Sequence, residues 1–124
     1  MRVRRGFTLI ELLVVMAALG LLLAIAAPRY AQHVDRAREA VLRQNLAGLR
    51  DAIDKFYADR ARYPADIQEL VKHRYLRQVP LDPVTDRTDS WVALPPAGQA
   101  SGVLADVRSG ASGNAHDGTP YASW

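Results

Sequence analysis

One carboxylate occupies an unusual position in this 124-residue sequence. Glu11 is the only charged residue in the 21 residues from Phe7 to Ala27, which as a helix would span the roughly 30 Å hydrocarbon core of a bilayer. An ionised carboxylate is costly in lipid unless it meets a positive charge. The apolar run itself contains no positive charge, so the pattern indicates that a cation from elsewhere meets Glu11.

Two other interpretations of this N-terminal stretch stay open. The first is an ordinary secretory signal peptide, with a basic start, an apolar core and a small-x-small cleavage site at residues 24–26. Glu11 early in the apolar run and Pro28 close to the cut both weigh against it. The second is a plain signal anchor in which Glu11 has no role, because the insertion cost of a charge falls away from the midplane. In the anchored forms the arginines ahead of the run leave the N-terminus in the cytoplasm and the rest outside the inner membrane.

Residue types that catalyse reactions are scattered over the rest of the chain. His33, His73 and His116 fall on a predicted helix, a second helix and a loop, without the spacing of a zinc enzyme. No serine stands in a nucleophile elbow, and no glycine-rich loop joins a strand to a helix to hold phosphate. The absence of cysteine excludes disulfides, thiolate zinc sites and thiol nucleophiles. We expect no enzyme activity and no required cofactor.

Oxygen donors gather near the C-terminus, where Asp106, Ser112, Asn114 and Asp117 lie in or beside a glycine-containing loop. Calcium accepts six to eight oxygens from carboxylates, amides and backbone carbonyls. Asp106, Ser112 and Asp117 are therefore candidate calcium ligands, and an ordinary solvated loop is the alternative. We expect calcium, if it binds, to raise the thermal stability of the domain.

Length and charge narrow the class of protein. A chain of 124 residues has room for one membrane segment and one small domain. The formal net charge of +3 equals the contribution of Arg2, Arg4 and Arg5, so the chain after Gly6 is balanced, with 13 basic and 13 acidic residues. Binding of nucleic acid through its phosphates needs a net basic face, and we therefore expect no nucleic acid partner.

Helical periodicity continues past Pro28, which we expect to kink or locally open the helix. The helix is predicted to run to about Ala61, with charges between its apolar positions Val34, Leu42, Leu46, Leu49, Ile53 and Phe56. Two pairs at i,i+4 spacing, Glu39 with Arg43 and Asp51 with Lys55, are expected on its exposed face.

The remaining sequence predicts a small domain around this helix. Residues 63–76 indicate a turn and a short helix capped by Asp66, followed by a proline- and aspartate-rich loop. Two strands, Trp91–Leu94 and Val103–Val107, form an antiparallel hairpin. The glycine-rich segment after Arg108 has no predicted regular structure and ends in Tyr121 and Trp124, which would pin it to the domain.

The stretch "RRGFTLIELLVV" resembles the processing and assembly motif of type IV pilin-like proteins. The layout of the whole chain resembles the pilin-like fold, and most of all the G-type major pseudopilin of type II secretion systems. The connector "VPLDPVTD" and the terminal "DVRSGASGNAHDGTPYASW" are similar to segments of that protein. In the terminal loop, which holds calcium in G-type pseudopilins, Ser112 stands where an aspartate would be expected.

The resemblance implies specific processing. A membrane-embedded aspartyl prepilin peptidase would cut between Gly6 and Phe7 and methylate the new terminus to N-methylphenylalanine. Glu11 would become the fifth mature residue and Pro28 the twenty-second, both implicated in assembly. The cut would create an amine at Phe7 within reach of Glu11, and the two would form a charge pair, most usefully on neighbouring chains. The expected organisation is a leader peptide at 1–6, a transmembrane helix at 7–27 and a periplasmic pilin-like domain at 28–124.

The resemblance also implies a fold and a function. The expected fold is α+β and pilin-like: a long N-terminal helix, half transmembrane and half amphipathic, packed on a small antiparallel β-sheet, with a glycine-rich C-terminal loop. The chain would be a structural subunit of a type II secretion pseudopilus, working with copies of itself, other pseudopilins, prepilin peptidase and an inner-membrane assembly platform. A minor type IV pilin for motility, adhesion or DNA uptake is the alternative. A secreted periplasmic binding protein with an ordinary signal peptide is the alternative of another class.

Overall fold

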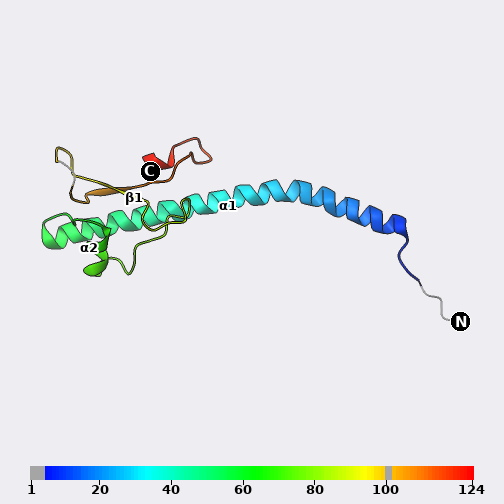
Figure 1. Ribbon diagram of the computed structural model, residues 1–124, viewed down its shortest axis with the longest axis horizontal. Helices are drawn as coiled ribbons and strands as arrows, with labels where there is room; N and C mark the ends of the chain where they lie inside the picture. Colours follow the sequence, from blue (N-terminus) through cyan, green and yellow to red (C-terminus); the bar gives the residue numbers. More distant parts are fainter. Residues whose placement is uncertain (1–4, 100–101) are drawn as a thin grey trace. The chain divides into compact units, whose positions relative to one another are not determined.

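The computed structural model describes residues 5–99 and 102–124. In chain order they form helix α1 (Leu9–Arg60), helix α2 (Ile67–Lys72), strands β1 (Trp91–Leu94) and β2 (Asp106–Ser109), and a 3-10 turn, η1 (Tyr121–Ser123) (Figure 1). Residues 1–4 of the predicted leader, with Arg2 and Arg4, lie outside the described residues. The elements confirm the predicted α+β arrangement of one long helix and a small antiparallel sheet.

The chain divides into two compact units, Met1–Asp35 and Arg36–Trp124. In the first unit α1 runs through Pro28 without a break in helical structure (Figure 1). The predicted local opening at Pro28 is therefore not seen. The division after Asp35 separates residues by their contacts within the chain. The predicted boundary after Ala27 is a different one, the end of the membrane-spanning segment, and it stays a prediction.

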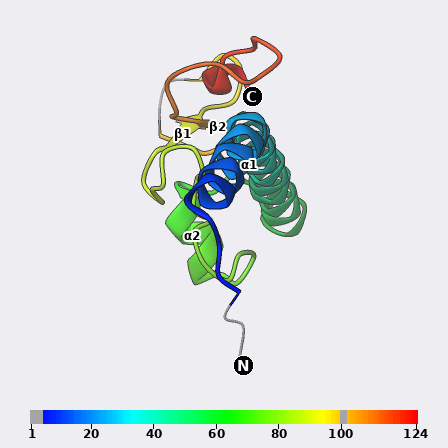
Figure 2. The same cartoon turned by 90° about the vertical axis from the view of Figure 1, so that its right-hand side faces the viewer.

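The core of the second unit is built on the predicted apolar stripe of α1 from Leu42 onward. These positions are buried together with Leu70 of α2 and with Leu104 and Val107 from the region of β2. The predicted Val34 is only half-buried and lies in the first unit. Figure 1 and Figure 2 show α2 and the β1–β2 ribbon on different sides of α1, so the helix is covered from two directions. The helix ends at Arg60, close to the predicted Ala61, and Ala61 itself has a positive φ of 53°. The buried residues of α1 in this core are Leu42, Leu46, Leu49, Ala52, Ile53 and Phe56.

Strand β1 has the predicted bounds, but β2 begins three residues later than the predicted Val103–Val107. Leu104 and Val107 are both fully buried. In a single strand, residues three apart point to opposite faces, so both cannot enter one core unless the chain bends between them. The Leu104 amide accordingly donates to the carbonyl of Pro64, at 2.8 Å, outside the β1–β2 ladder.

The antiparallel register of β1 and β2 pairs Trp91 with Ser109 and Leu94 with Asp106. The ladder ends at Gly110, where a Cβ atom would lie 2.0 Å from the carbonyl oxygen of Ser90. Only glycine fits this close approach of two backbones. The predicted loss of regular structure after Arg108 is thus off by one residue, and η1 adds a short turn near the end.

The proline- and aspartate-rich connector is a loop, as predicted, but Asp82 gives it a buried anchor. Its Oδ1 atom accepts from the amide of Val84 at 2.9 Å, and its Oδ2 atom accepts from the Ser109 hydroxyl at 2.5 Å. The indole of Trp91 donates to the carbonyl of Pro80 at 2.8 Å. These bonds tie the connector to both strands of the sheet.

Helix α2 begins as predicted, with the Asp66 side chain accepting from the amide of Glu69 at 2.9 Å. Glu69 is itself held by Arg62 at 2.5 Å and by the amide of Ala65 at 2.6 Å. The guanidinium of Arg62 is the main cause that lowers the pKa of Glu69 from 4.5 to about 2, with the Ala65 amide second. Glu69 therefore fastens the segment between α1 and α2 to the first turn of α2.

Replacement of Asp82 by alanine should destabilise the domain by about 2–4 kcal/mol, because the Ser109 hydroxyl and two backbone amides would lose a buried acceptor. Asp89→Ala is the matched control, since Asp89 is exposed and its ion pair among the described residues is with the exposed Arg87. Chemical unfolding of the detergent-solubilised full chain measures both. Equal losses in the two variants would contradict the anchoring role of Asp82.

Glu69→Gln should lower stability at neutral pH by roughly 1–2 kcal/mol, discounted because Arg62 is half exposed. The folded pKa lies below the unfolded one, so this stabilisation is complete above about pH 4.5 and disappears as the pH falls toward about 2. Unfolding curves at several pH values, compared with wild type, should converge in acid. Asp54→Asn, on an exposed side chain of α1, should leave the wild-type pH profile unchanged, and a gap that persists at pH 2 would rule out this linkage.

Candidate functional site

The first half of α1 presents apolar side chains to its surroundings on every side. Within the described residues it contains the one helical stretch long and apolar enough to cross a membrane, and none of that stretch is buried. Exposure of so large an apolar surface to water is unfavourable, and we therefore expect lipid or other helices to cover it. The large exposed side chains are Phe7, just before α1, and within it Leu9, Ile10, Leu12, Leu13, Val14, Val15, Met16, Leu19, Leu21, Leu22, Leu23 and Ile25.

Glu11 begins α1 by closing a capping box with Thr8. The Thr8 amide donates to Glu11 Oε2 and the Glu11 amide donates to Thr8 Oγ1, each at 3.2 Å. This reciprocal pairing satisfies two amides that the first helical turn leaves without partners. Our reading of the sequence missed it, although the Thr-x-x-Glu spacing is a known signal for a helix start.

The capping box uses one oxygen of Glu11. Among residues 5–99 and 102–124, no group donates a hydrogen bond to Glu11 Oε1, and no lysine, arginine or histidine forms an ion pair with the carboxylate. Phe7 and Glu11 border the same open hollow of about 500 Å³, together with Ile10, Val14 and Val15. The structure thus places the two predicted partners on one side of the helix start, with an apolar surface around the carboxylate.

Gly6 and Pro28, the other predicted processing and assembly residues, have no packing role that explains them. Gly6 lies in extended chain before α1, and a Cβ atom added there would contact nothing within 4 Å. Pro28 is exposed inside α1. The fold by itself does not require a glycine at position 6.

Glu39 was predicted on an exposed helix face beside Arg43, and this prediction is wrong. Its residue surface is only 5% exposed. It accepts from the His116 amide at 2.7 Å, from His116 Nδ1 at 2.5 Å and from the Tyr121 hydroxyl at 3.1 Å. Burial alone would raise the pKa of Glu39, but the hydrogen bonds from His116 and Tyr121 outweigh it and hold the pKa below its ordinary value. The other predicted pair, Asp51 with Lys55, is confirmed at 2.9 Å.

The candidate calcium ligands are engaged by different protein groups. Asp106, on β2, accepts from Arg50 Nε at 2.9 Å. Asp117 accepts from the amide and the hydroxyl of Thr119, at 3.0 and 2.6 Å. Ser112 is exposed in the terminal loop. In the part of the chain that the structure describes, no three acidic or histidine side chains gather in a way that would hold a metal ion.

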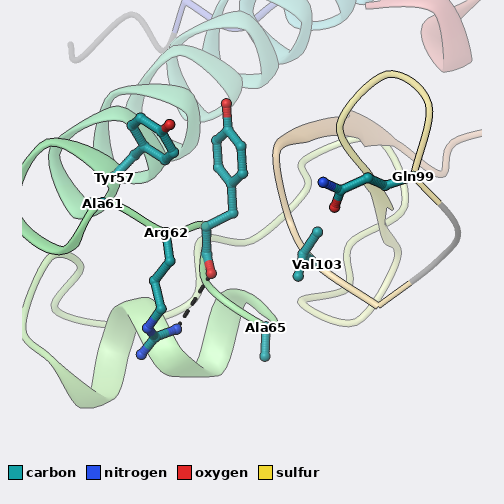
Figure 3. A pocket seen from close by; sticks show the side chains of 7 residues that line it. Tyr57, Ala61, Arg62, Ala65, Gln99 and Val103 are labelled. Carbon is teal, nitrogen blue, oxygen red and sulfur yellow. Dashed lines mark hydrogen bonds between the residues drawn. The ribbon is translucent and has the colours of Figure 1, made fainter.

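A pocket of about 450 Å³ lies beside the end of α1 (Figure 3). The Tyr57 and Tyr63 rings are 4.5 Å apart, and Arg62 is committed to Glu69 and to the carbonyl of Tyr63. These side chains include no nucleophile paired with a base, and we assign the pocket no chemistry. The lining residues are Tyr57, Ala61, Arg62, Tyr63, Ala65, Gln99 and Val103.

Known proteins resemble the chain at its N-terminus and over most of its length. The family model of the prokaryotic N-terminal methylation motif matches residues 1–27. Fimbrial protein EcpC of Eikenella corrodens is 31% identical over 123 residues, which cover 95% of this chain and 80% of that protein.

Two further relatives come from different systems. Type II secretion system core protein G of Pseudomonas aeruginosa is 31% identical over 98 residues, covering 66% of this chain and 69% of the relative. Type IV major pilin protein PilA of Myxococcus xanthus is 38% identical over 66 residues, covering 53% of this chain but 30% of that protein. No solved structure matches the chain significantly.

Proposed function

Because the chain belongs to the type IV pilin-like family, we propose that it is a structural subunit of a type II secretion pseudopilus, which polymerises through its N-terminal helix to drive protein export. The observation that carries this proposal is the apolar half of α1, none of which is buried, with Glu11 at its start and no cation beside it among the described residues. A surface of this kind is incomplete in a single chain. Lipid covers it before assembly, and the helices of neighbouring subunits cover it in the filament.

Glu11 supplies selectivity that apolar packing lacks. Apolar helices associate in many registers, because lipid and leucine side chains are equally apolar. A carboxylate in that surface is stabilised only where a cation meets it, which fixes the register of an incoming subunit. The amine of Phe7 on the neighbouring subunit is the cation we propose, and it exists once the chain has been cut after Gly6.

Cleavage between Gly6 and Phe7 by prepilin peptidase, with N-methylation of Phe7, is therefore part of the proposal. The match of residues 1–27 to the N-terminal methylation motif supports it. Before assembly the chain crosses the inner membrane once, with its C-terminal domain in the periplasm. Its partners are copies of itself, other pseudopilins and an inner-membrane assembly platform.

Two observations bear on the choice between a pseudopilus and a pilus. The similarity to core protein G and the absence of cysteine favour a pseudopilin, since adhesive type IV pilins usually carry a terminal disulfide loop. The similarity to a fimbrial protein covers more of the chain and supports the second candidate, a minor type IV pilin.

Intact-mass spectrometry of the protein recovered from native membranes should give a chain that begins at Phe7 and carries one added methyl group. This mass follows from cleavage after Gly6 and N-methylation. A mass that begins near Ala27 or Pro28 would instead identify a secreted protein with an ordinary signal peptide, and would remove the assembly role of Glu11.

Glu11→Gln should prevent filament assembly, so that the amount of cross-linked multimers falls by roughly tenfold or more. Membrane insertion and cleavage should continue. Glutamine at this position still supports a capping box, so the variant removes the charge and keeps the helix start. Thr8→Ala is the matched control, because it breaks the cap and keeps the carboxylate.

Both variants are to be expressed in a strain of the source bacterium that lacks the chain, with cross-linking, export of secreted enzymes and surface piliation as readouts. Loss of export in Glu11→Gln supports the pseudopilus, and loss of piliation with normal export supports the pilin. Normal assembly of Glu11→Gln together with failure of Thr8→Ala would show that Glu11 serves the helix cap alone.

A further inference from the structure

The C-terminal residues 110–124, here called the terminal segment, lie against α1 beside its first buried position. All of α1 before Glu39 is exposed or half-buried, and the core begins with Glu39 and Leu42. We propose that Glu39 fastens the terminal segment to α1 directly, so that the segment is ordered by an internal carboxylate and does not depend on a bound cation.

Glu39 has the burial and the partners that such a fastening needs. A buried carboxylate is costly unless donors reach its oxygens. Oε1 accepts from the His116 amide and the Tyr121 hydroxyl, and Oε2 accepts from His116 Nδ1. All three donors belong to the terminal segment, and their sequence separations from Glu39 are 77 and 82 residues. The carboxylate is therefore satisfied only when the segment is docked.

Arg43, one turn further along α1, provides a second point of attachment. Its guanidinium lies 4.1 Å from the centre of the Trp124 ring and 3.8 Å from Asp117 Oδ2. The Trp124 indole also donates to the Thr119 hydroxyl at 2.9 Å. The Glu39 carboxylate of the helix thus receives hydrogen-bond donors from the terminal segment. The Arg43 guanidinium, one turn later, meets a carboxylate and an aromatic face of the same segment.

The terminal segment also has its own backbone hydrogen bonds. The Ala115 amide donates to the carbonyl of Thr119 at 2.7 Å, and the Tyr121 amide donates to the carbonyl of Gly113 at 3.2 Å. Gly113 and Gly118 have positive φ values, which glycine adopts without strain. These bonds close the segment into a turn without a metal ligand.

The oxygen donors that we predicted for calcium are unsuited to share a cation here. Arg50 already neutralises Asp106, while Thr119 and Arg43 engage Asp117. A divalent cation would have to displace these groups and would stand close to guanidinium charges. The Asp106, Ser112 and Asp117 set therefore fits calcium poorly, and the arginines supply positive charge in its place.

The fastening has a consequence for the helix itself. Leu42 and Leu46 are 0% and 2% exposed, and they lie on the same stretch of α1 as Glu39 and Arg43. Release of the terminal segment would uncover this end of the core and lengthen the apolar part of α1 that other chains can contact. Glu39 thereby sets where the self-covered part of α1 begins.

The test uses the full chain in detergent, with Glu39→Gln and the matched control Asp35→Asn, each in EGTA and in millimolar calcium. Asp35 is exposed on α1 one turn before Glu39 and, among the described residues, forms no ion pair. Amide hydrogen exchange of residues 110–124 and the melting temperature are measured. We expect wild type and Asp35→Asn to give the same values with EGTA and with calcium. Glu39→Gln should lose protection at the His116 amide by roughly tenfold or more and melt several degrees lower in both conditions.

Two results would overturn the proposal. One is a wild-type segment that exchanges freely in EGTA and becomes protected in calcium, because a cation would then order it. The other is wild-type protection of the His116 amide in Glu39→Gln. If Glu39→Gln fails to fold, the wild-type comparison in EGTA and calcium still shows whether a cation orders the segment. His116→Ala then tests the role of the Glu39 carboxylate: it removes the side-chain donor and keeps the backbone donor, so protection of the residue 116 amide should fall only in part.

Discussion

The burial of one stripe of α1 is the constraint on which the rest of the structure depends. A helix cannot cover its own apolar side chains, and between Leu42 and Phe56 the stripe is covered by α2, by β2 and by the chain that precedes β2. Before Glu39 no residue of α1 is buried, although this part of the helix is the more apolar. The helix therefore needs two kinds of cover: its own chain supplies one, and the membrane or the filament supplies the other.

Two carboxylates on α1 show how the two kinds of cover differ. Glu39 is buried by its own chain and receives three hydrogen bonds from the terminal segment. Glu11 receives one amide, from Thr8, and no cation within the described residues. The partners of Glu39 thus come from its own subunit. In the proposed function the partner of Glu11 comes from a neighbouring subunit, so that Glu39 would hold one subunit together and Glu11 would join two.

Local patterns predicted the features whose physical cause lies within a few residues. The helical stripe from Leu42 onward, the cap at Asp66 and strand β1 depend on periodicity, on side chain to amide bonds and on turn residues, and all three are confirmed. The start of β2 was wrong because Leu104 and Val107 both enter the core, which requires a bend that alternation does not reveal. The exposed pairing of Glu39 with Arg43 was wrong because its spacing is equally compatible with burial under a distant segment.

The sequence by itself determined the membrane-length apolar run, the single carboxylate within it and the motif that precedes Phe7, because each is a property of consecutive residues. It also determined which face of the later helix is buried, since helical geometry places those positions together. Only the tertiary structure decided that Asp82 meets Ser109, 27 residues away, and that Glu39 meets His116, 77 residues away. Such pairs form when packing brings distant polar groups into one buried place. Many other carboxylates in the chain have similar local sequence, so only the folded core determines which of them receive these donors.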